Sequence, residues 1–131
     1  MINYCQLSKE DKFLFKDLIY NEGRDYEEFL NMGWTENQIV NQLNKNTNFS
    51  YGAFINERLI SFVLGDIFHI EKISEYEILL IYVCKNFRNK GLGKELVDKI
   101  IENYNNLKKI YLEVSKSNHE GILFYTKMNF K

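Results

Sequence analysis

A turn between an apolar stretch and an amphipathic stretch has residue types and spacing that could bind an anion. The apolar stretch, Glu77–Val83, is rich in branched and aromatic residues, which is typical of a buried strand. The turn carries Gly91 and Gly93, and a helix is expected to open there. The N–H groups and the positive dipole end of such a helix suit a phosphate, which glycines allow to approach the backbone closely. Arg88 and Lys90 add positive charge to the turn.

The pattern excludes two common nucleotide-binding loops. A Rossmann fingerprint needs three glycines, and two are present. A Walker A loop needs glycine where Arg88 stands and Ser or Thr where Glu95 stands. The remaining pattern, Arg-x-x-Gly-x-Gly after a strand, resembles the pyrophosphate-binding motif of the GNAT superfamily of acyl-CoA-dependent N-acyltransferases. Taken alone, the motif leaves open a loop and helix start without a ligand.

Composition limits the classes of protein that this chain can represent. A length of 131 residues fits a single domain, expected over 1–131, and a hydrophobic content of 45% is that of a globular chain. The net charge of -1 gives no sign of a nucleic-acid partner. Cys5 and Cys84 lie too far apart for a CxxC site and suggest no disulfide framework. No stretch has the length or composition of a membrane span or signal peptide, so a cytoplasmic protein is expected.

Capping signals predict two helices in the first third of the chain. Ser8–Asp11 resembles a capping box with Asp in place of Glu, and apolar residues then recur at helical spacing. Thr35–Gln38 is a clearer capping box, and Trp34 could pack as a hydrophobic staple against Ile39. The elements expected here are a strand over Ile2–Leu7, a helix to about Tyr20 and a helix through Leu43.

The rest of the chain predicts three further strands, then a helix, a strand and a helix. Asn56 and Glu57 should form the turn of a hairpin, and Ile70–Glu75 is expected to be a connection. The strands are placed at Phe49–Ile55, Arg58–Phe68, Leu79–Val83 and Ile110–Val114, and the helices from the glycine turn to about Asn105 and from Asn118 to Lys127. The order β α α β β β α β α predicts an α/β fold, a single-domain mixed sheet with helices on both faces.

The C-terminal part of the chain extends the resemblance to the GNAT superfamily. Ser117–Phe130 is similar to the superfamily's Ser-Asn-x-x-Ala-x-x-x-Tyr-x-x-x-Gly-Phe ending, and Leu112–Val114 is similar to the strand before it. The resemblance covers Glu75 to Phe130 and is greatest to bacterial ribosomal-protein-alanine N-acetyltransferases. This chain departs from the pattern at Lys85, Gly121 and Asn129, where proline, alanine and glycine are usual.

Relatives of this kind continue into two more C-terminal strands, which help to form the wall on the acceptor side. This chain ends at Lys131, so the domain is expected to be short at its C-terminus. If Ile110–Val114 is the final strand, one of its edges has no partner within the chain, and such edges tend to recruit another chain. We therefore expect either a two-fold homodimer or a truncated chain whose edge is solvated.

The resemblance implies the residues that would carry out acetyl transfer. Glu113 would act as general base through a water, although it could instead be a surface carboxylate paired with Lys108 or Lys109. Tyr125 would protonate the departing thiolate, since a phenol pKa of about 10 is close to that of a thiol. The alternative for Tyr125 is an aromatic residue that fills the helix–sheet interface. Asn118 would hydrogen-bond the CoA arm, or would simply be a polar residue of a first helical turn.

The resemblance also implies where acetyl-CoA would bind. The pantetheine arm would pair with the main chain of Ile81, Tyr82 and Val83, and the Val83 amide would polarise the thioester carbonyl. The pyrophosphate would lie against Asn89, Lys90, Gly91, Leu92, Gly93 and Lys94, and Arg88 would also bind the cofactor. No metal is expected, since the histidines and cysteines have no metal-ligand spacing.

The predicted function is therefore transfer of an acetyl group from acetyl-CoA to a primary amine. The resemblance favours the N-terminal α-amine of a protein as the acceptor, and a small-molecule amine is the alternative. An inactive CoA-binding regulatory module is a further alternative of a different class. Neither nucleic acid nor membrane is expected as a partner.

Overall fold

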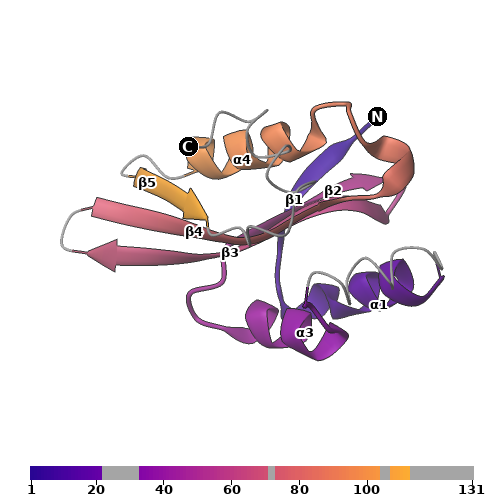
Figure 1. Cartoon of the computed structure of the whole chain (residues 1–131), viewed down its shortest axis with the longest axis horizontal. Coiled ribbons are helices and arrows are strands. Elements are labelled where there is room, and N and C mark those ends of the chain that lie inside the picture. The colour runs from indigo at the N-terminus through magenta and orange to yellow at the C-terminus, as the bar shows by residue number, and fades with distance from the viewer. Residues whose placement is uncertain (22–32, 71–72, 104–106, 113–131) are drawn as a thin grey trace.

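The computed structural model of the chain describes residues 1–21, 33–70, 73–103 and 107–112 (Figure 1). Within these residues, one sheet has the strand order β1-β2-β3-β4-β5, antiparallel from β1 to β4 and parallel between β4 and β5. Its strands are β1 (Asn3–Leu7), β2 (Ser50–Ile55), β3 (Arg58–Ile70), β4 (Ile73–Val83) and β5 (Leu107–Leu112). The helices are α1 (Lys12–Asn21), α3 (Glu36–Asn44) and α4 (Leu92–Asn103), with short 3₁₀ helices at Lys9–Asp11 and Lys85–Phe87.

Helices cover both faces of the sheet, as the sequence predicts. Figure 1 shows α4 on one face and α1 with α3 on the other. On the α4 face, Leu96 and Ile100 are fully buried in a core that includes Val63 of β3. On the opposite face, Phe15 of α1 meets Phe62 of β3 edge to face, with ring centroids 4.8 Å apart. Full burial of such side chains contributes about 1.5–3 kcal/mol each, so the two cores hold the three layers together.

The predicted capping boxes and hairpin are confirmed. Gln38 donates its backbone N–H to the Thr35 hydroxyl at 3.2 Å, and the Thr35 N–H donates to the Gln38 side chain at 2.8 Å. Trp34 packs against the core that contains Ile39, in agreement with the predicted staple. In the first box, the Ser8 N–H donates to the Asp11 carboxylate at 2.8 Å. The hairpin turn has positive φ angles at both central residues, 48° at Asn56 and 71° at Glu57, as a type I′ turn requires.

Three predicted strand boundaries are wrong. Ile70–Glu75 is not a connection, because β3 extends to Ile70 and β4 begins at Ile73, with Phe68 paired to Glu75 and His69 to Ser74. His69, Ser74 and Glu75 are polar and interrupt the apolar pattern near these strand ends, so the pattern does not mark where the strands stop. Strand β5 likewise begins at Leu107, ahead of the predicted start. The expected final helix and the end of the expected last strand lie outside the described residues.

An extra residue interrupts the pairing of β3 with β4. Leu64 pairs with Leu80 and Gly65 pairs with Ile78, so Leu79 of β4 has no opposite residue. Such a β-bulge bends the strand and increases its local twist. The bulge separates β4 into a first part, which pairs with β5 as far as Ile78, and a second part that leads to the glycine turn.

Polar and aromatic side chains pack tightly around the bulge. The buried Tyr76 hydroxyl donates to the Phe49 carbonyl, and burial raises the pKa of Tyr76 well above its usual value. Gln42 of α3 donates to the Gly65 carbonyl at 3.0 Å and to the Asp66 carboxylate at 2.7 Å. A Cβ at Gly65 would overlap the Tyr76 phenol and would lie 2.7 Å from the Glu77 carbonyl oxygen. This position therefore requires glycine for steric reasons.

Gly65→Ala should lower the free energy of unfolding by roughly 3 kcal/mol, the upper part of the range for overpacked cores. Urea unfolding followed by circular dichroism measures the change. Gly52→Ala is a matched control in the neighbouring strand, because its nearest atom is the flexible end of Leu59 at 2.7 Å. We expect a loss of about 1 kcal/mol or less for the control. Equal losses in the two variants would contradict the steric role of Gly65.

Candidate functional site

The glycine turn begins α4 with two residues in the left-handed backbone region. Asn89 has φ 64° and Gly91 has φ 80°. The Glu95 N–H donates to the Gly91 carbonyl at 3.0 Å, so the hydrogen bonding of α4 starts at Gly91. The N–H groups of residues 92–94 therefore have no acceptor within the helix, as at any helix start. This end of α4 has the donors and dipole that attract an anion.

The surface at the turn is open and carries positive charge. Gly91 is exposed, and a Cβ placed on it would meet no atom within 4 Å. Lys90 and Lys94 are exposed, with the Lys90 ammonium 5.7 Å from the centre of the Phe87 ring. Lys94 also forms an ion pair with Asp98, at 3.4 Å. A bound phosphate could thus be contacted by backbone N–H groups and by ammonium groups from the same turn.

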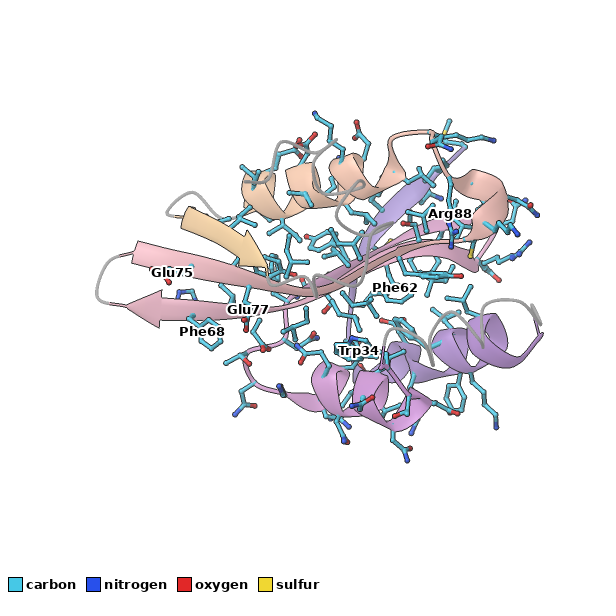
Figure 2. All side chains as sticks on the ribbon, in the orientation of Figure 1. Trp34, Phe62, Phe68, Glu75, Glu77 and Arg88 are labelled. Atoms are coloured by element: carbon cyan, nitrogen blue, oxygen red, sulfur yellow. The ribbon has the colours of Figure 1, made fainter. Side chains whose placement is uncertain are left out.

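Arg88 folds back onto the strand that precedes the turn. Its Nε donates to the Val83 carbonyl oxygen at 2.9 Å, and its guanidinium carbon lies 5.6 Å from the centre of the Tyr82 ring. Figure 2 labels this side chain at the end of the sheet where β4 leads into the turn. The Arg88 side chain therefore contacts the end of β4. The other residues predicted to bind the cofactor at this turn lie at the start of α4.

Strand β4 presents main-chain groups on the side away from β3. The Cys84 N–H donates to the Ile60 carbonyl at 2.9 Å, and the Tyr82 carbonyl accepts from the Ser61 hydroxyl at 2.8 Å. Because N–H and C=O groups alternate in direction along a strand, those of Ile81 and Val83 point to the opposite side. Of the three predicted main-chain contacts, the structure thus directs Ile81 and Val83 toward the β5 side and Tyr82 toward β3.

That side of β4 lacks a strand partner near the turn, within the part of the chain that the structure describes. The pairing of β4 with β5 ends at Ile78 and Leu112, just before the bulge. Residues 80–83 pair with β3, and their other edge has no described strand beside it. An extended ligand with amide groups could pair with such an edge as an added strand does. The open edge ends at the same turn that forms the start of α4.

The predicted catalytic residues Glu113 and Tyr125 lie outside the described residues, as does Asn118. One described carboxylate that was not predicted as a site residue is Glu77, which is half-buried on β4 in register with Asp66 of β3. Glu77, labelled in Figure 2, is also in register with Tyr111 of β5, which precedes Glu113 by two positions in the sequence. The sequence feature that could have indicated Glu77 is its place as an acidic residue directly before the apolar run of β4.

Two absences apply to the described part of the chain. No group of three His, Cys, Asp or Glu side chains there could hold a metal ion. The helices described are also too short or too polar to cross a bilayer.

Comparison with known proteins gives a family match over most of the chain. The model of the acetyltransferase (GNAT) family matches residues 14–130. A curated N-alpha-acetyltransferase of Saccharolobus solfataricus is 39% identical over 57 residues, which are 41% of this chain and 34% of that protein. The match thus spans about a third of the length of this curated relative.

Solved structures share the fold at low sequence identity. An aminoglycoside acetyltransferase from an uncultured soil metagenomic sample, in complex with sisomicin, has a TM-score of 0.74 and 16% identity, over 98% of this chain and 88% of that one. A ribosomal-protein-alanine N-acetyltransferase from Brucella melitensis has a TM-score of 0.70 and 19% identity, over 98% and 90%. A PaiA N-acetyltransferase from Thermoplasma acidophilum, in complex with coenzyme A, has a TM-score of 0.68 and 23% identity, over 100% and 90%.

Proposed function

The chain belongs to the acetyltransferase (GNAT) family, and from this premise we propose that it transfers an acetyl group from acetyl-CoA to a primary amine. One observation supports the proposal above the others. The open edge of β4, with the main-chain groups of Ile81 and Val83, leads directly into the anion-attracting start of α4. A ligand with an amide-bearing arm attached to a pyrophosphate, as in CoA, matches this sequence of features.

We assign the two parts of CoA to the two parts of the site. The pyrophosphate would accept hydrogen bonds from the backbone of the turn and the first turn of α4, with Lys90 and Lys94 adding charge. The amides of the pantetheine arm would pair with Ile81 and bring the thioester to the Val83 N–H, since the Val83 carbonyl accepts from Arg88. The full set proposed for the pyrophosphate is Asn89, Lys90, Gly91, Leu92, Gly93 and Lys94.

Acetyl transfer needs a deprotonated amine, a polarised thioester carbonyl and a proton for the departing thiolate. The Val83 N–H points to the open edge, where it could donate to the thioester oxygen as the carbonyl gains negative charge. Holding the amine and the thioester together removes part of the barrier, since effective molarities in such reactions reach about 10⁵–10⁸ M. A base and an acid complete the set of groups, and we propose Glu113 and Tyr125 for these roles.

Glu77 is a second candidate for the base. It lies on β4 beside the bulge, in register with the residue two positions before Glu113. Its side chain alternates with Tyr76 and Ile78, which are buried in the core on the α4 face, so it lies on the face that α1 and α3 cover. A carboxylate at either position could accept the amine proton through a water molecule.

For the acceptor we propose the N-terminal α-amine of a protein. The curated relative is described as an N-alpha-acetyltransferase, and one of the similar structures is a ribosomal-protein-alanine N-acetyltransferase. A small-molecule amine is the second candidate, since another similar structure is an aminoglycoside acetyltransferase bound to sisomicin. A CoA-binding module without activity is the third. A cytoplasmic location and a two-fold dimer also stay predictions.

Thiol release from acetyl-CoA distinguishes the three candidates. Peptides with a free N-terminal alanine, aminoglycosides and simple polyamines would be supplied as acceptors, and calorimetry would measure CoA binding in parallel. Turnover with the peptides and not with the other amines is the expected result. A cell extract would serve as a further source of acceptors. Tight CoA binding with no turnover on any of these amines or on the extract would favour the binding module.

Gly91→Glu should abolish CoA binding while the protein remains folded. The added carboxylate would stand in front of the N–H groups that we assign to the pyrophosphate and would repel it. Calorimetry should show at least a hundredfold loss of affinity. Gly91→Ala is the matched control, because it shares the unfavourable positive φ, which costs about 1–2 kcal/mol, but adds no charge. The assignment is wrong if folded Gly91→Glu binds CoA as well as Gly91→Ala does.

Glu113→Gln and Glu77→Gln separate the two candidates for the base. Loss of a general base typically lowers the rate by about 10²–10⁴-fold, so the variant of the true base should lose at least tenfold in kcat. The same variant should lose the acid limb of the pH–rate profile, because that limb reports ionisation of the base. The other variant should keep both kcat and the limb. Full activity in both variants would show that positioning alone suffices.

Tyr125→Phe should lower kcat by at least roughly tenfold and leave the affinity for acetyl-CoA little changed. The phenol is proposed to act only when the thiolate departs, so its loss should affect turnover more than binding. Steady-state thiol release and calorimetry measure the two quantities separately. A parallel loss of affinity and rate would assign Tyr125 to binding.

A further inference from the structure

The Arg88 side chain makes a hydrogen bond within the protein that is not itself one of the CoA contacts proposed above. The first residue of the Arg-x-x-Gly-x-Gly pattern was expected to bind the cofactor by adding positive charge to the phosphate site. Instead its Nε donates to the Val83 carbonyl at 2.9 Å. The guanidinium is also held over the Tyr82 ring, at 5.6 Å, and the side chain is half-buried. These contacts direct the arginine toward the strand end, five residues back along the chain.

The Val83 carbonyl lies on the side of β4 where a strand would otherwise pair. Its direction follows from the neighbouring Cys84 N–H, which donates to Ile60 of β3. Beyond Ile78, no described residue of β5 reaches this part of β4. Among the described residues, the guanidinium is therefore the group that pairs with the last carbonyl of β4. A carbonyl oxygen that accepts from a cation forms one of the stronger hydrogen bonds in a protein.

We propose that Arg88 is a positioning residue that holds the end of β4, and that it is not a ligand of the pyrophosphate. The inference rests on the proposed function, since it concerns how the CoA arm meets Val83. With the carbonyl held by Arg88, the Val83 N–H is fixed in direction and faces the open edge. The planar guanidinium is suited to this role, because it donates to the carbonyl and stacks on Tyr82 at the same time.

Two ligands distinguish positioning from phosphate binding. CoA carries both the pantetheine arm and the phosphates, whereas 3′-phospho-ADP carries the phosphates alone. If Arg88 positions β4, Arg88→Ala should weaken CoA binding about tenfold and leave 3′-phospho-ADP affinity within twofold of wild type. If Arg88 binds phosphate, both affinities should fall by the same factor. Competition against a fluorescent CoA derivative measures both ligands on one scale.

Lys90→Ala is the matched control, because it removes one positive charge two residues further along the same turn. The Lys90 ammonium is exposed and assigned to the phosphates, so its loss should weaken CoA and 3′-phospho-ADP by similar factors. A difference between the two variants therefore reports where each side chain acts and not the change in net charge.

Arg88→Lys supplies a second test that needs only CoA and does not depend on 3′-phospho-ADP. Lysine keeps the charge that a phosphate needs but lacks the planar fork, so positioning predicts a CoA affinity close to that of Arg88→Ala. A CoA affinity close to wild type for Arg88→Lys would overturn the inference. Thermal unfolding of each variant establishes that folded proteins are compared. If Arg88→Ala does not fold, the CoA and 3′-phospho-ADP affinities of Arg88→Lys provide the test.

The outcomes separate this inference from the proposed function. Wild-type protein that binds neither CoA nor 3′-phospho-ADP would overturn the proposed function and the role of Arg88 with it. Wild-type protein that binds CoA, with Arg88→Ala losing both ligands equally, would overturn only the role of Arg88. A selective loss of CoA affinity in Arg88→Ala, with Lys90→Ala losing both ligands, is the expected result.

Discussion

The extra residue in β4 determines how the two halves of that strand are used. Before Leu79, β4 pairs with β3 on one side and β5 on the other. After Leu79 its pairing with β3 continues, and the described part of β5 has already ended. One strand can in this way belong to the interior of the sheet and also present main-chain donors and acceptors at an edge where no described strand pairs. The proposed acetyl-CoA site depends on this change of partners.

Buried polar groups hold the sheet in this arrangement beside the bulge. The carboxylate of Asp66, a residue that is 5% exposed, accepts from Gln42 and from the Thr47 hydroxyl at 2.7 and 2.8 Å, and Lys45 lies 3.8 Å away. An unsatisfied buried carboxylate would be costly, so these partners fix the segment between α3 and β2 against β3. On the other face, the Tyr76 hydroxyl secures the same segment through the Phe49 carbonyl. The strand therefore carries its irregularity without loss of register.

Features encoded by neighbouring residues could be predicted from the sequence. Thr35 and Gln38 specify a helix start through reciprocal hydrogen bonds, and Asn56 readily adopts the positive φ of its turn. The start of β4 could not be predicted, because Ser74 pairs with His69 across the sheet and neither is apolar. The partner of the Arg88 side chain could not be predicted either. The motif places an arginine before the turn, but only the folded structure shows that its guanidinium contacts the Val83 carbonyl. The same limit applies to Glu77, whose neighbours on β3 and β5 come from distant parts of the chain.

Cys84 stands at the junction between β4 and the 3₁₀ helix that leads to the glycine turn. This residue is 3% exposed, and its carbonyl accepts from the Phe87 N–H at 2.8 Å, whereas Cys5 on β1 is exposed. A thiol reagent can therefore modify Cys5 in the folded protein, but it can reach Cys84 only when this junction opens. The ratio of the two alkylation rates gives the free energy of that local opening, with one cysteine serving as the internal reference for the other. The chain thus contains a natural chemical probe of how often the turn separates from the sheet.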